Sequence, residues 1–464
     1  MRVHKLSFLV LLGFAASIPL EDSVSFGVGR ISKVLGLVAL GVWVLAVAST
    51  GMVRRPVPAM WLASGLVGWS LLSYFWSDVP EETLTKVGTL AQLLTVVWLV
   101  WDQTPNQRAL NAVLRAFVLG AFIAAVLTLV AAATGRATEG SRFASANAGP
   151  NNTGALLVVA VCMAVYLRRI DYDARYRVLY ALFVPVAIVG VILTASRTAA
   201  ISLATGLLII VVGTRRFTLR RVVGLAAVGV VAIGLAVSFV PQRSLDRLAT
   251  TPTEISAGDL NGRTYYWKLS VQLFAQRPVQ GIGAGAFPDA NLRLGGRGIV
   301  AHNAFLSVLV ELGAVGIALF LGMLGLAVAG IASQPRDRRG MWMAMGATWF
   351  VGANSLTWEV RKITWFLLAV ALAQGRINSR AKVSSAAPSE EAPRARVGSH
   401  RSSCDVSRSE QQVEDLALSG DAAASHQNRD DPHSPVDRNG LVLSGLEAAR
   451  VGLKANPTGT DTEA

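Results

Sequence analysis

The sequence is poor in charged residues and almost free of cysteine. Asp, Glu, Lys and Arg make up 16% of its 464 residues, against roughly a quarter in a typical soluble domain. Water is therefore not the main solvent of this chain. The two cysteines, Cys162 and Cys404, match no zinc-ligand spacing, and we expect neither a structural disulfide nor a zinc site.

Long apolar stretches take the place of charge. Hydrophobic residues make up 52% of the chain, and its mean hydropathy is +0.47. Stretches such as residues 118–133, 222–240 and 303–331 approach or exceed the roughly 20 residues needed to cross a bilayer core. The sequence predicts an all-α polytopic membrane protein with about twelve transmembrane helices, near residues 6–20, 31–49, 57–75, 86–101, 110–133, 151–167, 178–195, 198–213, 222–240, 303–332, 341–356 and 361–375.

The placement of basic residues predicts the orientation. The formal net charge is +14, and the excess lies in the membrane body because the polar tail mixes both signs. This pattern indicates topology and anionic ligands rather than nucleic acid. With a cytoplasmic N-terminus, the positive-inside rule is satisfied by basic inner loops at residues 54–55, 108, 168–177, 215–221 and 336–339.

This orientation divides the chain into a membrane domain and a tail. We expect the membrane domain over residues 1–376, with a large external loop at 241–301 between the ninth and tenth helices. Residues 377–464 are expected to form a disordered cytoplasmic tail. Residues 1–20 resemble a signal peptide, but Ala16–Leu20 makes a poor cleavage site, so we interpret them as a retained first span.

Two arginines stand on the expected outer face. Arg197 interrupts the apolar stretch 178–213 at a tight turn, and Arg263 precedes an expected interfacial helix over residues 264–276. A guanidinium presents a planar fork that matches phosphate oxygens. Arg197 is thus an anion clamp or a snorkelling anchor, and Arg263 binds the phosphate of a substrate lipid or of any phospholipid.

His302, Asn303 and Glu311 mark the start of the tenth span. An imidazole that titrates near neutral pH at the mouth of a membrane cavity can accept a proton from a hydroxyl, although a lone histidine is more often structural. Glu311 lies about three turns deeper on roughly the opposite face, so we expect no direct pair with His302. It either organises neighbouring helices or lines a cavity.

Two more stretches have compositions suited to a functional site, but the sequence does not assign them a definite role. Residues 281–287 are rich in glycine but lack the GxGxxG spacing, and we interpret them as a flexible loop that lets the chain approach a ligand closely. A polar cluster before the sixth span either binds sugar hydroxyls or caps the loop and helix: Arg142, Asn147, Asn151 and Asn152.

Together these residues resemble the signatures of the O-antigen ligase and polymerase (Wzy-like) superfamily. The most recognisable signature is similar to His302-Asn303-Ala304-Phe305-Leu306 followed by Glu311-Leu312-Gly313 and Gly316. The other marks are similar to Ser196-Arg197, to Gly262-Arg263 through Trp267 with the 281–287 run, and, more weakly, to the stretch from Arg142 to Asn152. The resemblance covers the whole membrane body and leaves the tail unmatched.

The resemblance implies a membrane-embedded, GT-C-like glycosyltransferase of the bacterial cytoplasmic membrane that serves cell-envelope or exopolysaccharide biosynthesis. It would move a glycan from a polyprenyl diphosphate, such as undecaprenyl diphosphate, to a hydroxyl of a glycan, lipid or protein acceptor. Arg197 and Arg263 would bind the diphosphate, and His302 would be the base. Arg142, Asn151, Asn303 and Glu311 would bind glycan or support the site. Two guanidiniums can neutralise the diphosphate, so we expect no metal and no cofactor.

The motifs do not separate a ligase from a polymerase, and a different class also stays open. A transporter or flippase of lipid-linked saccharides would act on the same molecules without chemistry. Such proteins usually carry charges deep within several spans, whereas the candidate functional residues of this chain lie at the expected outer surface. We therefore favour the transferase, with other polysaccharide-assembly proteins as partners.

Overall fold

The computed structural model describes most of the predicted membrane domain. It covers residues 2–213, except 24, 27–28, 140–141 and 146–147, together with residue 234 and residues 262–386. The predicted ninth span lies outside the described residues, apart from residue 234. Asn147, residues 241–261 of the expected external loop and the tail beyond residue 386 also lie outside them.

Every other predicted span is occupied by a helix. These helices are α1 (Arg2–Ser17), α2 (Ile31–Thr50), α3 (Pro58–Leu72), α4 (Pro80–Gln103), α5 (Gln107–Ala133), α6 (Pro150–Ile170), α7 (Ala174–Leu193), α8 (Arg197–Val212), α14 (Ala304–Ala332), α15 (Arg336–Ala353) and α16 (Lys362–Ala386). Two shorter helices, α12 (Arg263–Gln276) and α13 (Phe287–Arg293), precede α14. The rest consists of 3-10 turns η1 (Ile18–Leu20), η2 (Ser73–Phe75) and η3 (Trp358–Val360) and a two-residue pair, β1 (Ser25–Phe26) with β2 (Gly29–Arg30).

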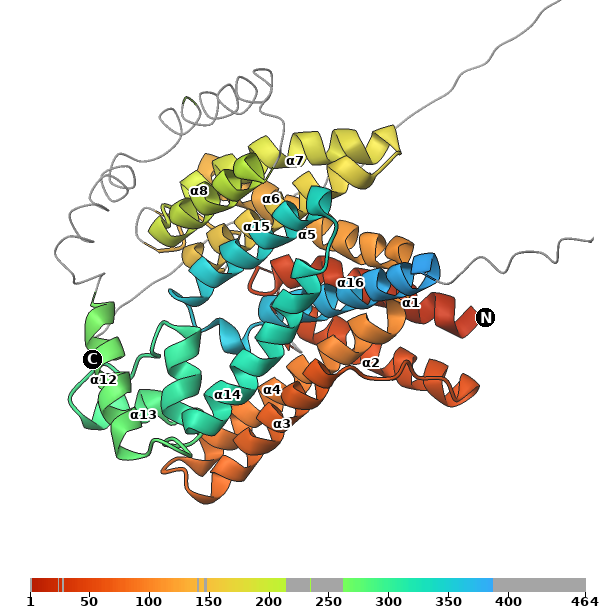
Figure 1. Ribbon diagram of the computed structural model, residues 1–464. Coiled ribbons are helices and arrows are strands. Elements are labelled where there is room, and N and C mark those ends of the chain that lie inside the picture. Colours follow the sequence, from red (N-terminus) through yellow and green to blue (C-terminus); the bar gives the residue numbers. More distant parts are fainter. Residues whose placement is uncertain are drawn as a thin grey trace, which may run out of the picture. The chain divides into compact units, whose positions relative to one another are not determined.

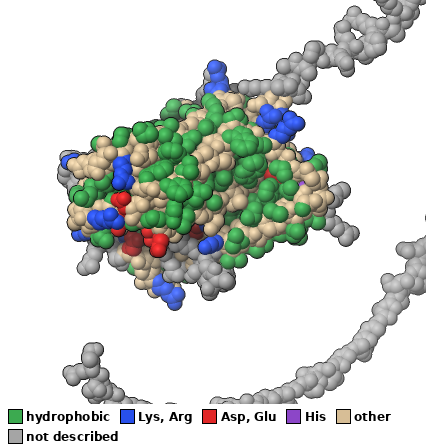
Figure 2. All heavy atoms as spheres, turned by 90° about the horizontal axis from the view of Figure 1, so that it is seen from below, with side chains coloured by type: hydrophobic (Ala, Val, Ile, Leu, Met, Phe, Trp, Pro, Cys, Tyr) green, Lys and Arg blue, Asp and Glu red, His purple; other side chains and the backbone are tan. Residues whose placement is uncertain are grey.

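The helical class is thus confirmed for the described part of the chain. Seven of its helices are long and apolar enough to cross a membrane. The total of twelve spans stays a prediction. One face of the protein is broadly covered by hydrophobic side chains (Figure 2), as a surface in contact with lipid requires.

Local signals in the sequence place the helix ends. Proline occupies the first turn of α3, α4 and α6, where its missing N–H costs nothing. Side chains cap other starts: Asn106 accepts from the Ala109 N–H before α5, and Asn303 accepts from the Phe305 and Leu306 N–H groups before α14. These caps fix where the loops that carry the candidate residues begin.

The helices pack through small residues around one large hydrophobic core, with two smaller clusters, one of which joins α12 to α14. Main neighbours are α8 with α15, α14 with α3, α16 with α4, α6 with α7, and α1 with both α2 and α5. Gly120 of α5 lies against the Ala16 carbonyl of α1, and Gly330 of α14 lies against Gly375 of α16. Such contacts let apolar helices approach closely where no water drives them together. Helices α12 and α13 lie together at the left end in Figure 1, beside the ends of α3 and α14.

Helix α14 is broken at Gly313, which has φ 66° and ψ −162°. A break at this depth frees backbone groups that lipid cannot satisfy. The segment after α12 supplies the partners: the N–H groups of Ile282 and Gly283 donate to the carbonyls of Val310 and Glu311, at 3.0 and 2.9 Å. In return, the Pro278 carbonyl accepts from the Ala314 N–H at 2.8 Å.

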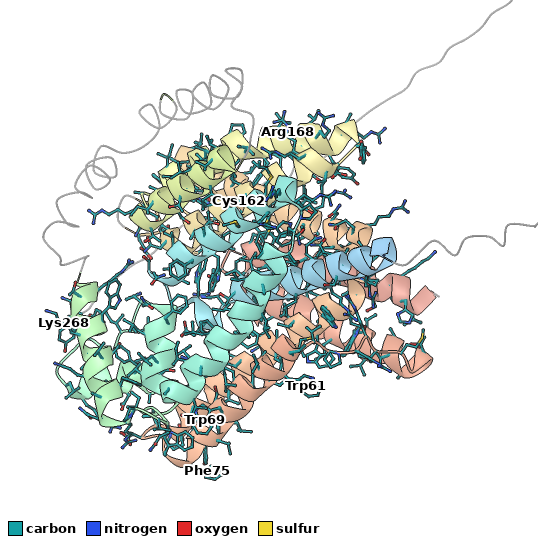
Figure 3. All side chains as sticks on the ribbon, in the orientation of Figure 1. Trp61, Trp69, Phe75, Cys162, Arg168 and Lys268 are labelled. Atoms are coloured by element: carbon teal, nitrogen blue, oxygen red, sulfur yellow. The ribbon has the colours of Figure 1, made fainter. Side chains whose placement is uncertain are left out.

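Side chains of α3, η2 and α4 complete this arrangement. The Trp69 indole N–H donates to the freed Leu312 carbonyl at 2.9 Å, from the end of α3 that approaches α12 and α13 (Figure 3). Ser73 accepts from the Ala284 N–H at 3.0 Å, and the Thr83 hydroxyl donates to the Ala284 carbonyl at 2.8 Å. The break is therefore a built feature of the fold.

The interpretation of residues 281–287 as a flexible loop is wrong. Ala284 and Phe287 are buried, and the segment is hydrogen-bonded to η2, α4 and α14. Its glycines do permit a close approach, but to a broken helix rather than to a ligand. Gly281, with φ 72°, lies directly against the backbone of Glu311 and Gly313.

A methyl group at the break tests this account. In Gly313→Ala the new Cβ meets the Val279 carbonyl and the residue keeps an unfavourable φ, so we expect a loss of about 2–4 kcal/mol of stability. Thermal unfolding of the detergent-solubilised protein measures it. Gly325→Ala in the same helix is the control, because nothing lies within 4 Å of its Cβ. Equal unfolding temperatures in the two variants would contradict the account.

Candidate functional site

The helix ends that carry the predicted site residues meet at one end of the bundle. Helices α8 and α15 run in opposite directions, because Ser202 donates to the Thr348 carbonyl at 2.8 Å while Gly213 contacts Gly340. The start of α8 therefore lies toward the end of α15. The loop after α15 contacts the start of α14, where Asn303 donates to the Asn354 carbonyl at 3.4 Å.

His302 stands immediately before the capping residue of α14. Its backbone φ is 50°, a left-handed conformation that residues other than glycine rarely adopt. The Asn303 cap on one side and the buried Ala301 on the other hold this backbone in place. The imidazole is half-buried and faces the Tyr266 ring of α12, with 6.4 Å between ring centroids.

The structure brings Arg263 and His302 together. Arg263 and Tyr266 lie one turn apart on α12, whose buried side, formed by Leu269 and Leu273, packs toward α14. Burial and, second, the positive charge of Arg263 lower the pKa of His302 below its ordinary value. The imidazole is therefore neutral at a lower pH than usual, in the form that accepts a proton.

Arg197 opens α8 on a turn that another arginine stabilises. The turn passes through Ala195, whose φ of 45° is left-handed. Arg142 donates to the Thr194 carbonyl at 2.9 Å, and Ser196 caps α8 by accepting from the Ala199 N–H. Arg197 itself is half-buried at the first position of the helix.

The Arg142 cluster is a bracing network rather than an open sugar-binding surface. Arg142 is 6% exposed and, besides Thr194, donates to Asn151 at 2.7 Å and to Glu139 at 3.1 Å. The Asn152 side chain accepts from the Trp358 indole N–H at 3.2 Å. Asn151 and Asn152 thereby connect the start of α6 to the α7–α8 turn and to η3.

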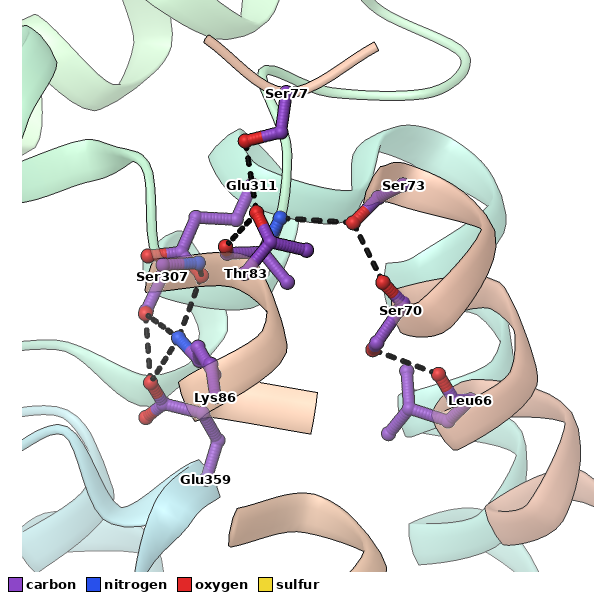
Figure 4. A network of polar contacts seen from close by, with 11 residues as sticks. Leu66, Ser70, Ser73, Ser77, Thr83, Lys86, Ser307, Glu311 and Glu359 are labelled. Carbon is purple, nitrogen blue, oxygen red and sulfur yellow. Dashed lines mark hydrogen bonds and ion pairs between the residues drawn. The ribbon is translucent and has the colours of Figure 1, made fainter. Parts of the chain in front are cut away.

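A buried ion cluster, which we call the Lys86 cluster, lies beside the start of α14 and contains Lys86, Ser307, Glu311 and Glu359. Lys86 Nζ is 2.5 Å from Glu311 Oε2 and 3.3 Å from Glu359 Oε1 (Figure 4). Ser307 donates to Glu359 Oε1 at 2.6 Å, and the Gly285 N–H donates to Glu311 Oε2 at 2.8 Å. Its side chains come from α4, α14 and η3.

The contacts of this cluster indicate which role the buried Glu311 carboxylate has. Of the two roles left open by the sequence, the geometry favours organising neighbouring helices, because the carboxylate joins α4, α14 and the Gly285 segment. Glu311 and His302 make no direct hydrogen bond among the described residues. Asn303 likewise has a structural role, since it caps α14 and contacts the loop after α15.

Sequence reasoning missed Lys86, Ser307, Glu359 and Tyr266 as members of this region. Lys86 and Glu359 lie 273 positions apart, and each sits at a loop or helix start where a charge is ordinarily solvated. An isolated lysine in the first turns of an apolar helix was the available signal. Among the described residues, no group of three or more His, Cys, Asp or Glu is placed to hold a metal.

The arrangement offers two kinds of chemistry at one end of the bundle. Guanidiniums at the starts of α8 and α12 can bind a diphosphate, and a neutral imidazole beside Arg263 can accept a proton from a hydroxyl. The Lys86 cluster and Arg142 fix the backbone on which these groups stand. Preorganised charges of this kind stabilise a developing anion without reorganisation.

The Lys86 cluster predicts a pH dependence of stability. It sets one ammonium against two carboxylates, and Glu359 Oε2 has no hydrogen-bond partner among the described residues. Burial raises the pKa of Glu359, so the folded state holds a proton that the unfolded chain releases at about pH 4.3. Stability therefore falls as pH rises from there through the raised pKa.

We expect Glu359→Gln to flatten this fall, because the amide is neutral at every pH and its oxygen still accepts from Ser307. Thermal unfolding between pH 4.5 and 8.5, chosen as about the window above the ordinary glutamate pKa, measures the slope. Glu81→Gln, an exposed residue of the same helix as Lys86, is the control. An unchanged slope in Glu359→Gln would show that its carboxyl is ionised throughout.

Comparison with known proteins relates one part of the chain to a family. A search of curated proteins finds no match to the chain. Residues 182–321 match the family model described as O-Antigen ligase, and this range contains Arg197, Arg263, His302, Asn303 and Glu311. The chain therefore carries an O-antigen ligase family domain at residues 182–321, within a protein whose described part has seven helices long and apolar enough to cross a membrane.

Proposed function

We propose that this protein is a glycosyltransferase that moves a glycan from a polyprenyl-diphosphate carrier to an acceptor hydroxyl at the outer face of the cytoplasmic membrane. It would act as a ligase or a polymerase in O-antigen or exopolysaccharide assembly. The juxtaposition of Arg263 with a half-buried His302, inside the matched family domain, carries the proposal. Membrane-embedded helices fit a substrate that is itself lipid-linked.

The residues divide the reaction between them. Arg197 and Arg263 bind the diphosphate, and His302 accepts the proton of the acceptor hydroxyl. The hydroxyl oxygen forms a bond to the anomeric carbon while the bond from that carbon to the diphosphate oxygen breaks, so the carrier leaves as a polyprenyl diphosphate. Attack opposite to the leaving group inverts the anomeric centre. Two guanidiniums supply the charge that a metal ion would otherwise provide.

Removing any one of these groups is expected to slow transfer strongly. In purified, reconstituted protein with a polyprenyl-diphosphate oligosaccharide as donor, Arg197→Ala and Arg263→Ala lower kcat about 100-fold or more, since each removes charge from the leaving group. His302→Ala lowers it by a similar factor, within the roughly 100- to 10,000-fold range of a general base.

The matched control is Arg293→Ala, an exposed arginine of α13 at the same end of the bundle, which we expect to keep parental activity. Activities are compared only among variants whose unfolding temperatures match that of the parent protein. Full activity in the three site variants would show that Arg197, Arg263 and His302 have structural roles only. A parent that moves the lipid-linked donor across the bilayer without transferring glycan would instead identify a flippase.

The lowered pKa of His302 predicts the pH profile. Because the base must be neutral, kcat/KM rises with pH through the pKa of His302, which lies below the ordinary value of about 6.5. In Arg263→Gln the nearby positive charge is gone, so this pKa rises and the acidic limb moves to higher pH. The pH dependence of His302 carbethoxylation, followed by peptide mass spectrometry, measures the same shift where activity is too low.

Lys268→Gln provides the comparison, because Lys268 is an exposed cation of the same helix that does not contribute to the pKa of His302. Its titration midpoint is expected to equal that of the parent. If Arg263→Gln also kept the parental midpoint, Arg263 would not face the imidazole in solution.

A further inference from the structure

A polar cavity lies at the opposite end of the bundle from the candidate site. Its volume is about 810 Å³, within the range of cavities that take small ligands. Helix α6 separates the two regions: Asn151 and Asn152 stand at its start, and Ile170 at its end lines the cavity. Its 21 residues correspond to about 31 Å along the helix axis.

We call this space the inner cavity, because its walls belong to loops that the positive-inside rule places in the cytoplasm. The start of α5 contributes Gln107, Arg108, Asn111 and Arg115. The end of α6 and the α6–α7 loop contribute Tyr166, Arg169 and residues 170–173, and the start of α15 contributes Arg338 and Met341.

The two described acidic residues of the inner cavity accept hydrogen bonds from neighbouring protein groups. The two carboxylate oxygens of Asp171 accept from Arg115 at 2.9 and 2.8 Å, and one of them also accepts from the Tyr180 hydroxyl at 2.7 Å. Asp173 caps α7 by accepting from the Arg175 N–H at 2.9 Å. Arg115 is fixed further by the Tyr176 ring, 3.9 Å from its guanidinium carbon.

Positive charge therefore dominates the inner cavity. Among the described residues, four arginines line it against two aspartates, and the N-terminal ends of α5 and α15 add the positive ends of two helix dipoles. The Gln107 amide at the same wall already donates to Asn111 and Gln374, at 2.8 and 3.0 Å, and so braces the wall. Ile170 and Met341 supply apolar surface beside these groups.

We propose that the inner cavity binds a phosphate group through Arg108, Arg169 and Arg338. A planar guanidinium matches phosphate oxygens, and basic pockets between transmembrane helices on the cytoplasmic side accept anionic lipid head groups. The phosphate is supplied by an anionic phospholipid of the inner leaflet or by a soluble phosphorylated compound. The inner cavity is thus a second anion site, independent of the reaction proposed at the other end.

The test compares two sets of arginines that carry the same charge. Arg108→Gln/Arg169→Gln/Arg338→Gln removes three guanidiniums from the inner cavity. Arg168→Gln/Arg175→Gln/Arg177→Gln removes three exposed ones from the same end of α6 and α7 that do not line it; Arg168 is labelled in Figure 3. Equal losses of surface charge make diffuse attraction the same in both variants.

Binding of short-chain phosphatidylglycerol, phosphatidylcholine and inorganic pyrophosphate to the full-length protein in detergent is measured by native mass spectrometry and thermal shift. We expect the parent to prefer phosphatidylglycerol over phosphatidylcholine by about tenfold, the energy of one charge-assisted contact. The cavity variant loses this preference, and the control variant keeps it within about twofold. Competition by pyrophosphate identifies a site open to soluble phosphates, and its absence identifies a lipid site.

The proposal is overturned if both triple variants weaken binding equally, since diffuse surface charge then accounts for it, or if neither does. Glycan transfer by the cavity variant is measured in parallel and is expected to match that of the control variant. If the cavity variant lost glycan transfer while the parent and control variant still showed the predicted phosphate binding, the substitutions would have disturbed the candidate site at the other end of the bundle. The proposal for the inner cavity would then still stand.

Discussion

The broken helix α14 is the constraint on which the rest of the site region depends. A helix interrupted at membrane depth leaves backbone donors and acceptors that lipid cannot satisfy, and each unsatisfied group costs several kcal/mol by order of magnitude. Here residues 278–283 and Trp69 satisfy them. That requirement fixes the position of the whole segment between α12 and α14, and with it the helix that carries Arg263.

Glu311 extends this constraint to the neighbouring elements. It lies just before the break, and its carboxylate joins Lys86 of α4 to the Gly285 N–H, while Lys86 also reaches Glu359 and Ser307. Ser307 belongs to the first turn of α14, one turn after Asn303. The break, the ion cluster and the start of α14 thus form one continuous support beneath His302.

Backbone strain points to the same region. In the described part of the chain, only Ala195 and His302 adopt positive φ without being glycine. One precedes Arg197 by two residues, and the other is the predicted base. Strain of this kind persists only where surrounding contacts enforce it, and it gathers at functional positions. Arg142 and the Asn303 cap are the contacts that enforce it here.

Periodicity and apolar length in the sequence were sufficient for the helical class and for the helix positions in the described part of the chain, while the roles of Arg197, Arg263 and His302 stay predictions. Apolar length and helix caps act locally, so they can be read along the chain. The break at Gly313, the packed 281–287 segment and the Lys86 cluster could not be read in this way, because each joins residues that lie tens to hundreds of positions apart. Whether a glycine marks a loose loop or a close contact, and whether a charge is solvated or buried, depends on which other helix lies opposite, and only the tertiary structure decides that.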